Sequence, residues 1–129
     1  MSQWQDRRQR RGVRGELVAM EFLVSLGWEV EAHRFRLGRH DLDLVMRRGQ
    51  LIAFVEVKTR RSNACGSAIE SVSAFKQRKL GRIATYWRVR YGRPGDTYRF
   101  DVVAVQDRGS GRWEVDRVED AWRLEWSIC

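Results

Sequence analysis

The order of hydrophobic patterns along the chain predicts an α/β sandwich around one mixed sheet. Helical spacing covers residues 13–26 and 71–91, and strand-like patterns cover 28–35, 41–47, 51–59, 98–105 and 113–118. A chain of 129 residues is long enough for one hydrophobic core and too short for two ordinary domains. We therefore expect one domain over residues 13–129. The preceding residues 1–12 are Arg-dense and predict a flexible basic arm, which either lies along phosphates or is a solvated tail.

The first helix is predicted by apolar residues at helical spacing between Val13 and Leu26, and Gly27 marks its end. Glu16 lies in the first turn of this stretch. A carboxylate there complements the helix dipole, which is a structural role, and a functional role stays open beside it.

Two apolar runs joined by Arg47-Arg48-Gly49-Gln50 predict a β-hairpin, after a strand at 28–35 and a loop at 36–39. With Gly49-Gln50 central in the turn, Asp43 lies opposite Glu56, whereas with Arg48-Gly49 central Asp41 does. In both registers we expect the three carboxylates to share one face of the sheet with Lys58.

A polar connection at 60–71, which we expect to be mobile, leads into the second helix. The outer face of that helix is basic and carries Lys76, Arg78, Lys79, Arg82, Arg88 and Arg90. Such a face is either simply solvated or, as we prefer here, contacts phosphate. Residues 92–96 predict a turn, and residues 119–128 predict a short closing helix with Trp122 and Trp126 four residues apart.

The charge balance points to a polyanionic partner. The chain has 25 Lys and Arg against 17 Asp and Glu, a net charge of +8 and a pI near 10.5. No long apolar stretch favours a membrane, and the first eleven residues have no apolar segment of a secretory signal, so we expect a cytoplasmic protein. Cys65 and Cys129 have no metal-ligand spacing and are expected to be free thiols.

Carboxylates gathered on one strand face usually hold a cation, because burial and mutual repulsion otherwise cost free energy. Asp43 and Glu56 offer the oxygen ligands that Mg²⁺ prefers, and Lys58 lies two residues beyond Glu56, close enough to orient a water. The alternative is an exposed charged pair on a solvated sheet face, which contributes little.

Several motifs in combination resemble the bacterial YraN family. They are Gly15-Glu16, Asp41-Leu42-Asp43-Leu44-Val45, Phe54-Val55-Glu56-Val57-Lys58-Thr59-Arg60, Val72 with Lys76-Gln77-Arg78, and Arg99-Phe100-Asp101-Val102-Val103. That family is similar to archaeal Holliday junction resolvases of the PD-(D/E)XK superfamily. The resemblance covers residues 13–122 and implies a restriction-endonuclease-like three-layer sandwich, with a central mixed sheet flanked by helices.

The resemblance also implies roles for single residues. Asp43, Glu56 and Lys58 occupy the catalytic positions, Asp43 and Glu56 are the implied ligands of Mg²⁺ or Mn²⁺, and Glu16 is the implied helix-borne acid. The chain departs from the family pattern at His40 and Asp41, where Gly and Glu are usual. We expect His40 to be a bystander, with a phosphate contact or proton carrier as alternatives, and Asp41 to be at most auxiliary. Asp101 is expected to be structural, paired with a basic residue.

Together these observations predict a metal-dependent endonuclease for structured or branched DNA. The expected DNA contacts are Arg60, Arg61, Lys76, Arg78, Lys79 and Arg82. The alternative is a nucleic-acid-binding module of the same fold that has lost catalysis. A homodimer is expected by analogy with resolvases only.

Overall fold

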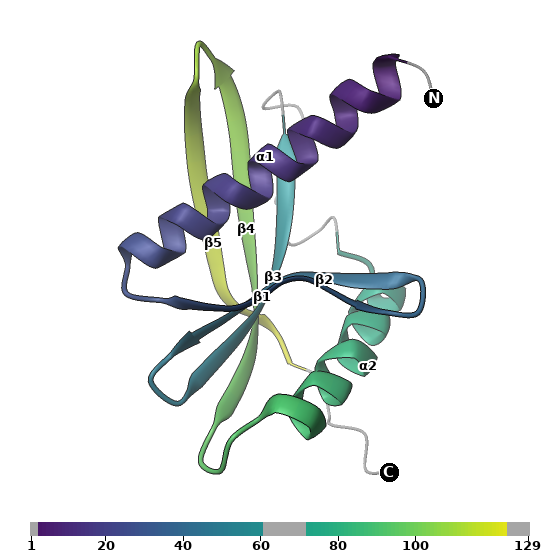
Figure 1. The fold of residues 1–129 in the computed structure, drawn as a ribbon, viewed down its shortest axis with the longest axis vertical. Coiled ribbons are helices and arrows are strands. Elements are labelled where there is room, and N and C mark those ends of the chain that lie inside the picture. The colour runs from purple at the N-terminus through teal and green to yellow at the C-terminus, as the bar shows by residue number, and fades with distance from the viewer. Residues whose placement is uncertain (1–2, 61–71, 124–129) are drawn as a thin grey trace.

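The computed structural model describes residues 3–60 and 72–123, which form two helices and five strands in those ranges (Figure 1). In chain order they are α1 (Gln3–Ser25), β1 (Glu29–Leu37), β2 (His40–Arg48), β3 (Leu51–Arg60), α2 (Ala74–Tyr91), β4 (Thr97–Gly109) and β5 (Arg112–Trp122). This order of helices and strands is the predicted one.

The five strands form one mixed sheet in the order β1-β2-β3-β4-β5. Neighbours are antiparallel except β3 and β4, which run parallel from Leu51↔Thr97 to Arg60↔Gln106. Parallel neighbours need a long crossover, and the chain between β3 and β4 contains α2. The mixed sheet expected from the sequence is confirmed.

Two hydrophobic clusters make the sheet the middle layer of three. On one face Ala19 and Leu23 of α1 pack with Leu44, Val55 and other sheet residues. On the other face α2 contributes Leu80, Ile83, Ala84 and Trp87 to a cluster that includes Phe54 and Phe100. Because the middle of β3 is buried on both faces, Glu56 lies inside the molecule, whereas Lys58 and Arg60 near the end of the strand are partly exposed.

Helix α1 is longer than predicted. It begins at Gln3, so residues 3–12 are helical where a flexible arm was expected. It ends as predicted, since Gly27 has φ +95° and its N–H donates to the carbonyl of Val24. Gly15 lies against β3, where a Cβ atom would be only 2.1 Å from Oγ1 of Thr59. Glycine is therefore needed for α1 to approach the sheet at this point.

The turn between β2 and β3 decides between the two predicted registers. Arg48 pairs with Leu51 and Leu44 with Val55, so Gly49 and Gln50 are the central turn residues. Gly49 has φ +64° and Gln50 does not have a positive φ, as in a type II′ turn. This is the register that places Asp43 opposite Glu56.

The prediction of a closing helix at 119–128 is wrong over its first residues. Strand β5 continues to Trp122, whose ring stacks on Phe100 at 5.1 Å. Asp120 has φ +49°, outside the right-handed helical region, and its N–H donates to Asp101 Oδ1 at 2.9 Å. Long-range pairing with β4 thus overrides the local helical spacing. Pairing between β1 and β2 also corrects the loop expected at 36–39, because β1 extends to Leu37 and β2 starts at His40.

Some expectations lie outside the described residues. They are the connection at 61–71 with Arg61 and Cys65, and the end of the chain with Trp126 and Cys129. Neither helix in the described ranges is long and apolar enough to cross a membrane.

Candidate active site

Strands β2 and β3 separate at Asp43. Their backbone pairing runs from Arg48↔Leu51 to Leu44↔Val55, and beyond it the two strands run apart (Figure 1). At the point of separation, the backbone N–H of Val57 donates to Oδ2 of Asp43 at 2.8 Å instead of to a β2 carbonyl. The side chain of Asp43 therefore fills the opening between the strands and lies beside Glu56.

Glu56 is buried, with 6% of its side chain exposed, and two lysines neutralise it. The Nζ atom of Lys76 in α2 lies 2.5 Å from Oε1 of Glu56, and the Nζ atom of Lys58 lies 3.5 Å from the same oxygen. A buried carboxylate requires such partners to remain charged. The structure thus brings together Asp43, Glu56 and Lys58 as predicted, and adds Lys76.

The pKa values of the group reflect this crowding. Burial, followed by the negative charge of Glu56, raises the pKa of Asp43 to about 7. Burial and the neighbouring Lys76 lower the pKa of Lys58. Burial also acts to lower the pKa of Lys76, but its hydrogen bond to Glu56 and the charge of Glu56 raise it overall. A carboxylate that titrates near neutrality in a charged cluster is typical of a functional site.

Glu16 reaches the same region from α1. It is buried, its Oε1 lies 3.1 Å from Nε2 of His33, and Arg34 donates to both of its carboxylate oxygens at 2.9 and 3.0 Å. The charge of Glu16 contributes to the raised pKa of Asp43. Arg34 has φ +56°, an uncommon backbone conformation for a residue with a side chain. Because α1 begins at Gln3, Glu16 lies inside the helix and not in its first turn, so the expected dipole role is wrong; its ion pairs with β1 hold it beside the site.

Asp41 and His40 lie apart from this group. Oδ1 of Asp41 accepts a hydrogen bond from Nε of Arg36 at 2.9 Å near the tip of the β1–β2 hairpin, and His40 is exposed at the start of β2. Leu42 packs on the α2 side of the sheet, as Val45 does, so the strict alternation of β2 is interrupted next to Asp43. The expectation that Asp41 shares the face of Glu56 and Lys58 therefore fails.

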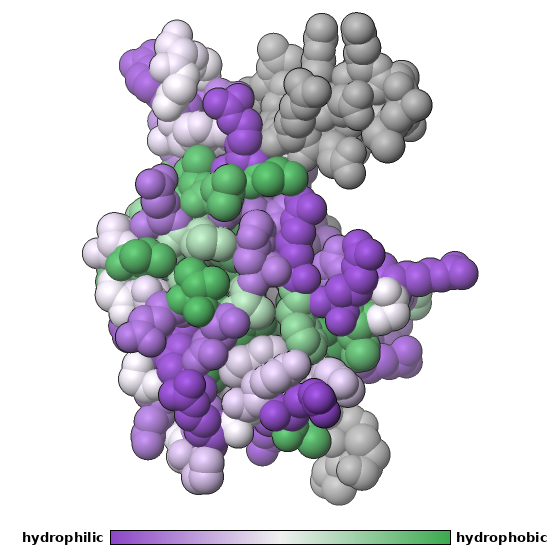
Figure 2. Space-filling model, viewed as in Figure 1, coloured by the Kyte–Doolittle hydropathy of each residue, from purple (hydrophilic) through white to green (hydrophobic). Residues whose placement is uncertain are grey.

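The cations predicted to contact DNA lie on β3 and α2. Arg60 ends β3, and Arg78 and Arg82 are exposed on α2, whereas the Nζ atom of Lys79 lies 4.3 Å from the ring centre of Phe75. Figure 2 shows hydrophilic side chains over the region that α2 and the β1–β2 hairpin occupy in Figure 1. Unlike its neighbours on α2, Lys76 is turned inward to Glu56.

Sequence reasoning missed the roles of His33, Arg34 and Lys76. A signal for Lys76 exists in the sequence Ser73-Ala74-Phe75-Lys76. Ser73 caps α2 and its side chain accepts from the N–H of Lys76, the position at which a capping box has Glu or Gln. A cation in the first turn opposes the helix dipole, so its presence points to a partner elsewhere.

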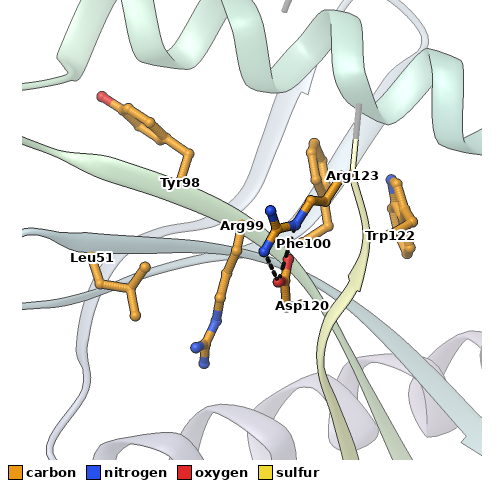
Figure 3. Close-up of a pocket in the computed structure, with 7 residues that line it drawn as sticks. All are labelled: Leu51, Tyr98, Arg99, Phe100, Asp120, Trp122 and Arg123. Atoms are coloured by element: carbon orange, nitrogen blue, oxygen red, sulfur yellow. Dashed lines mark hydrogen bonds and ion pairs between the residues drawn. The ribbon is translucent and has the colours of Figure 1, made fainter. Parts of the chain in front are cut away.

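Asp101 has the structural role predicted for it. It is fully buried, Nε of Arg99 lies 3.0 Å from its Oδ1, and it accepts the N–H of Asp120. Arg99 and Asp120 also line a cavity of about 400 Å³ (Figure 3). Its other lining residues are Leu51, Tyr98, Phe100, Trp122 and Arg123, with Arg123 paired to Asp120. None of the predicted catalytic residues lines this cavity.

The donor set at Asp43 and Glu56 fits a hard divalent cation. Two carboxylates from adjacent strands, one of them with a raised pKa, are the ligands that Mg²⁺ and Mn²⁺ take, with water and phosphate in the other positions. Among residues 3–60 and 72–123, no group of three or more His, Cys, Asp or Glu side chains is placed to hold a metal ion.

The three-layer fold, with acidic residues at a point where two central strands separate, defines a restriction-endonuclease-like α/β protein. Residues 15–105 match the model of the uncharacterised protein family UPF0102. The chain belongs to this family, which is the YraN family that the motifs indicated.

Similar proteins from several bacteria match most of the chain and support its assignment to this family. A UPF0102 protein of Symbiobacterium thermophilum is 38% identical over 113 residues, covering 88% of this chain and 96% of the relative. A UPF0102 protein of Nocardia farcinica is 40% identical over 112 residues, covering 87% and 88%. One of Caldicellulosiruptor saccharolyticus is 43% identical over 94 residues, covering 73% and 80%.

Proposed function

We propose that this protein is a metal-dependent endonuclease that hydrolyses phosphodiester bonds in structured or branched DNA. The observation that carries the proposal is the assembly of Asp43, Glu56 and Lys58 where β2 and β3 separate. The net charge of +8 and the exposed cations of α2 support a nucleic-acid substrate. The preference for branched DNA rests on the resemblance to resolvases.

In this proposal Asp43 and Glu56 hold Mg²⁺ or Mn²⁺. The chemistry that such an ion supplies when bound is polarisation of a phosphoryl oxygen and acidification of a water. Lys58, whose ammonium lies 3.5 Å from Glu56, orients the attacking water and stabilises negative charge that develops on the phosphate. Glu16, fixed by His33 and Arg34, is a secondary acid.

The DNA contacts of the proposal are basic residues of β3 and α2, together with Arg61, which lies outside the described residues. The cations that contact the phosphate backbone are Arg60, Arg61, Arg78, Lys79 and Arg82. Such contacts position the substrate without reading its sequence. A homodimer belongs to the same proposal, because cutting two strands of a branched substrate needs two sites. Light scattering during size-exclusion chromatography tests it.

The proposal is tested with labelled branched, duplex and single-stranded DNA in Mg²⁺ or Mn²⁺. The protein should cut at least one substrate, and Lys58→Ala should stop the cutting. Absence of cleavage on every substrate, with Mn²⁺ binding verified by calorimetry, would contradict it.

A second candidate is a nucleic-acid-binding module without catalysis. The neutralisation of Glu56 by two lysines favours it, since salt bridges already satisfy that carboxylate. This candidate predicts salt-dependent DNA binding that Glu56→Ala leaves unchanged, and no heat of Mn²⁺ binding. The two candidates therefore give opposite results in one titration.

A further inference from the structure

Lys76 is placed where its own helix does not favour it. It occupies the first turn of α2, which contains no acidic residue, and its ammonium opposes the positive end of the helix dipole. Burial also acts against its charge. The contact with Glu56, at 2.5 Å, and the negative charge of Asp43 compensate for these costs.

The two lysines at Glu56 differ in their freedom to leave. Lys58 is on the central strand β3 and only 16% of its side chain is exposed, so its ammonium has less access to water than that of Lys76. Lys76 is 41% exposed, and a rotation about its side-chain bonds brings its ammonium into water. Both ammonium groups contact the same oxygen, Oε1 of Glu56. Of the two, Lys76 is the exchangeable partner.

We infer that Lys76 is a positioning residue that occupies the cation position at Glu56 in the metal-free protein and competes there with a divalent ion. This inference rests on the proposed metal site at Asp43 and Glu56. The ammonium of Lys76 uses only one lone pair of Glu56 Oε1, but a divalent ion bound to the same carboxylate would lie close to that ammonium and be repelled by it. Binding of the ion therefore favours movement of Lys76, which links metal binding to the start of α2.

The test is calorimetric titration with Mn²⁺ alone, without DNA, on four proteins. Lys76→Gln removes the charge and creates a Ser-x-x-Gln capping box, so α2 should remain folded. Lys76→Arg retains the charge. Lys79→Gln is the matched control, because it makes the same charge change three residues along α2, where the ammonium lies over Phe75.

The expected result is about tenfold tighter Mn²⁺ binding by Lys76→Gln than by the wild type, within the usual range for coupled sites. Lys76→Arg should remain within about twofold of the wild type because it keeps the charge. Lys79→Gln should do the same because the Lys79 ammonium lies over Phe75 and solvent screens its charge. Equal affinities for Lys76→Gln and Lys79→Gln would overturn the inference, and so would absence of Mn²⁺ binding in both.

Thermal unfolding supplies a second measurement that does not depend on affinity. In EDTA, Lys76→Gln should melt below the wild type because Glu56 has lost its nearer cation, and saturating Mn²⁺ should remove the difference. A purely structural role predicts a deficit that Mn²⁺ leaves unchanged, which would also overturn the inference. Lys76→Met is the second neutral variant if Lys76→Gln does not fold.

The outcome is separable from that of the proposed function. A Mn²⁺ response in Lys76→Gln without cleavage of any DNA would support the role of Lys76 and contradict nuclease activity. Cleavage of DNA by the wild type, without any effect of Lys76→Gln on Mn²⁺ affinity, would support nuclease activity and overturn the role of Lys76.

Discussion

At the scale of single residues, Asp43 links the fold to the chemistry. Its carboxylate replaces a backbone acceptor for Val57, which lets β2 leave β3 and opens space beside Glu56. The same burial and the proximity of Glu56 raise its pKa to about 7. One side chain therefore shapes the opening and, in the proposed metal site, supplies a ligand to it.

The raised pKa of Asp43 has a consequence for stability without metal. Its ordinary pKa is 3.8 and its pKa in the folded chain is about 7, so folding takes up a proton between these values. The stabilisation that protonated Asp43 provides is therefore fully present below pH 3.8 and is lost as the pH rises through about 7. The negative charges of Glu56 and Glu16 favour protonation of Asp43, whereas the positive charge of Lys76 opposes it.

Asp43→Asn should remove this dependence, because asparagine still accepts the Val57 N–H but does not ionise. We expect its melting temperature in EDTA to rise relative to the wild type between pH 5 and pH 8. Differential scanning calorimetry at several pH values measures this difference. A constant difference across that range would show that Asp43 ionises as freely in the folded protein as in the unfolded chain.

At the scale of elements, the position of α1 depends on its contact with β3 next to Lys58. A Cβ atom at Gly15 would meet Thr59 Oγ1 at 2.1 Å and Val105 Cγ2 at 3.0 Å, whereas one at Gly12 would meet nothing within 4 Å. The two glycines are thus a matched pair on one helix. Glu16 follows Gly15, so this contact also fixes the position of the proposed secondary acid.

Gly15→Ala should lower the free energy of unfolding by about 1 to 3 kcal/mol, the usual cost of overpacking. Gly12→Ala should raise it by about 0.5 to 1 kcal/mol, because alanine restricts the unfolded chain and favours helix. Urea denaturation of both variants measures these changes. Equal effects of the two substitutions would mean that α1 does not approach β3 this closely.

The elements also show what sequence patterns can and cannot predict. The shared face of Glu56 and Lys58 was predictable from strand period, and the turn limited the register to two choices. The position of Asp41 was not predictable, because the alternation of β2 is interrupted next to Asp43. The end of β5 was not predictable, because Trp122 pairs with Phe100 across the sheet while its local spacing is helical. The inward turn of Lys76 likewise depends on a partner twenty residues away in sequence.

At the scale of the whole molecule, the net charge of +8 favours association with a polyanion. Its use in binding depends on where the cations lie. Arg78 and Arg82 are exposed one turn apart on α2, whereas Arg108 and Arg112 lie near the β4–β5 turn, a different part of the molecule (Figure 1). The two pairs provide a comparison at equal charge.

Replacing Arg78 and Arg82 by Gln should reduce the slope of log Kd for DNA against log salt by about 0.9 per lost phosphate contact, about 2 in all. Replacing Arg108 and Arg112 by Gln should leave the slope nearly unchanged. Fluorescence anisotropy at several salt concentrations measures both slopes. If both double variants reduced the slope equally, binding would follow net charge and α2 would not be the DNA surface.

The central claim is that Asp43, and not merely negative charge near it, supports phosphodiester hydrolysis. The most direct measurement is single-turnover cleavage of a four-way DNA junction in Mn²⁺ by the wild type, Asp43→Asn and Asp41→Asn. Each variant loses one carboxylate, and the two positions are two residues apart in the sequence, but Asp41 is paired with Arg36 outside the site. We predict that Asp43→Asn slows cleavage by about 100-fold or more and that Asp41→Asn stays within about threefold of the wild type. Equal rates for the two variants, or a wild type that leaves the junction intact, would contradict the claim.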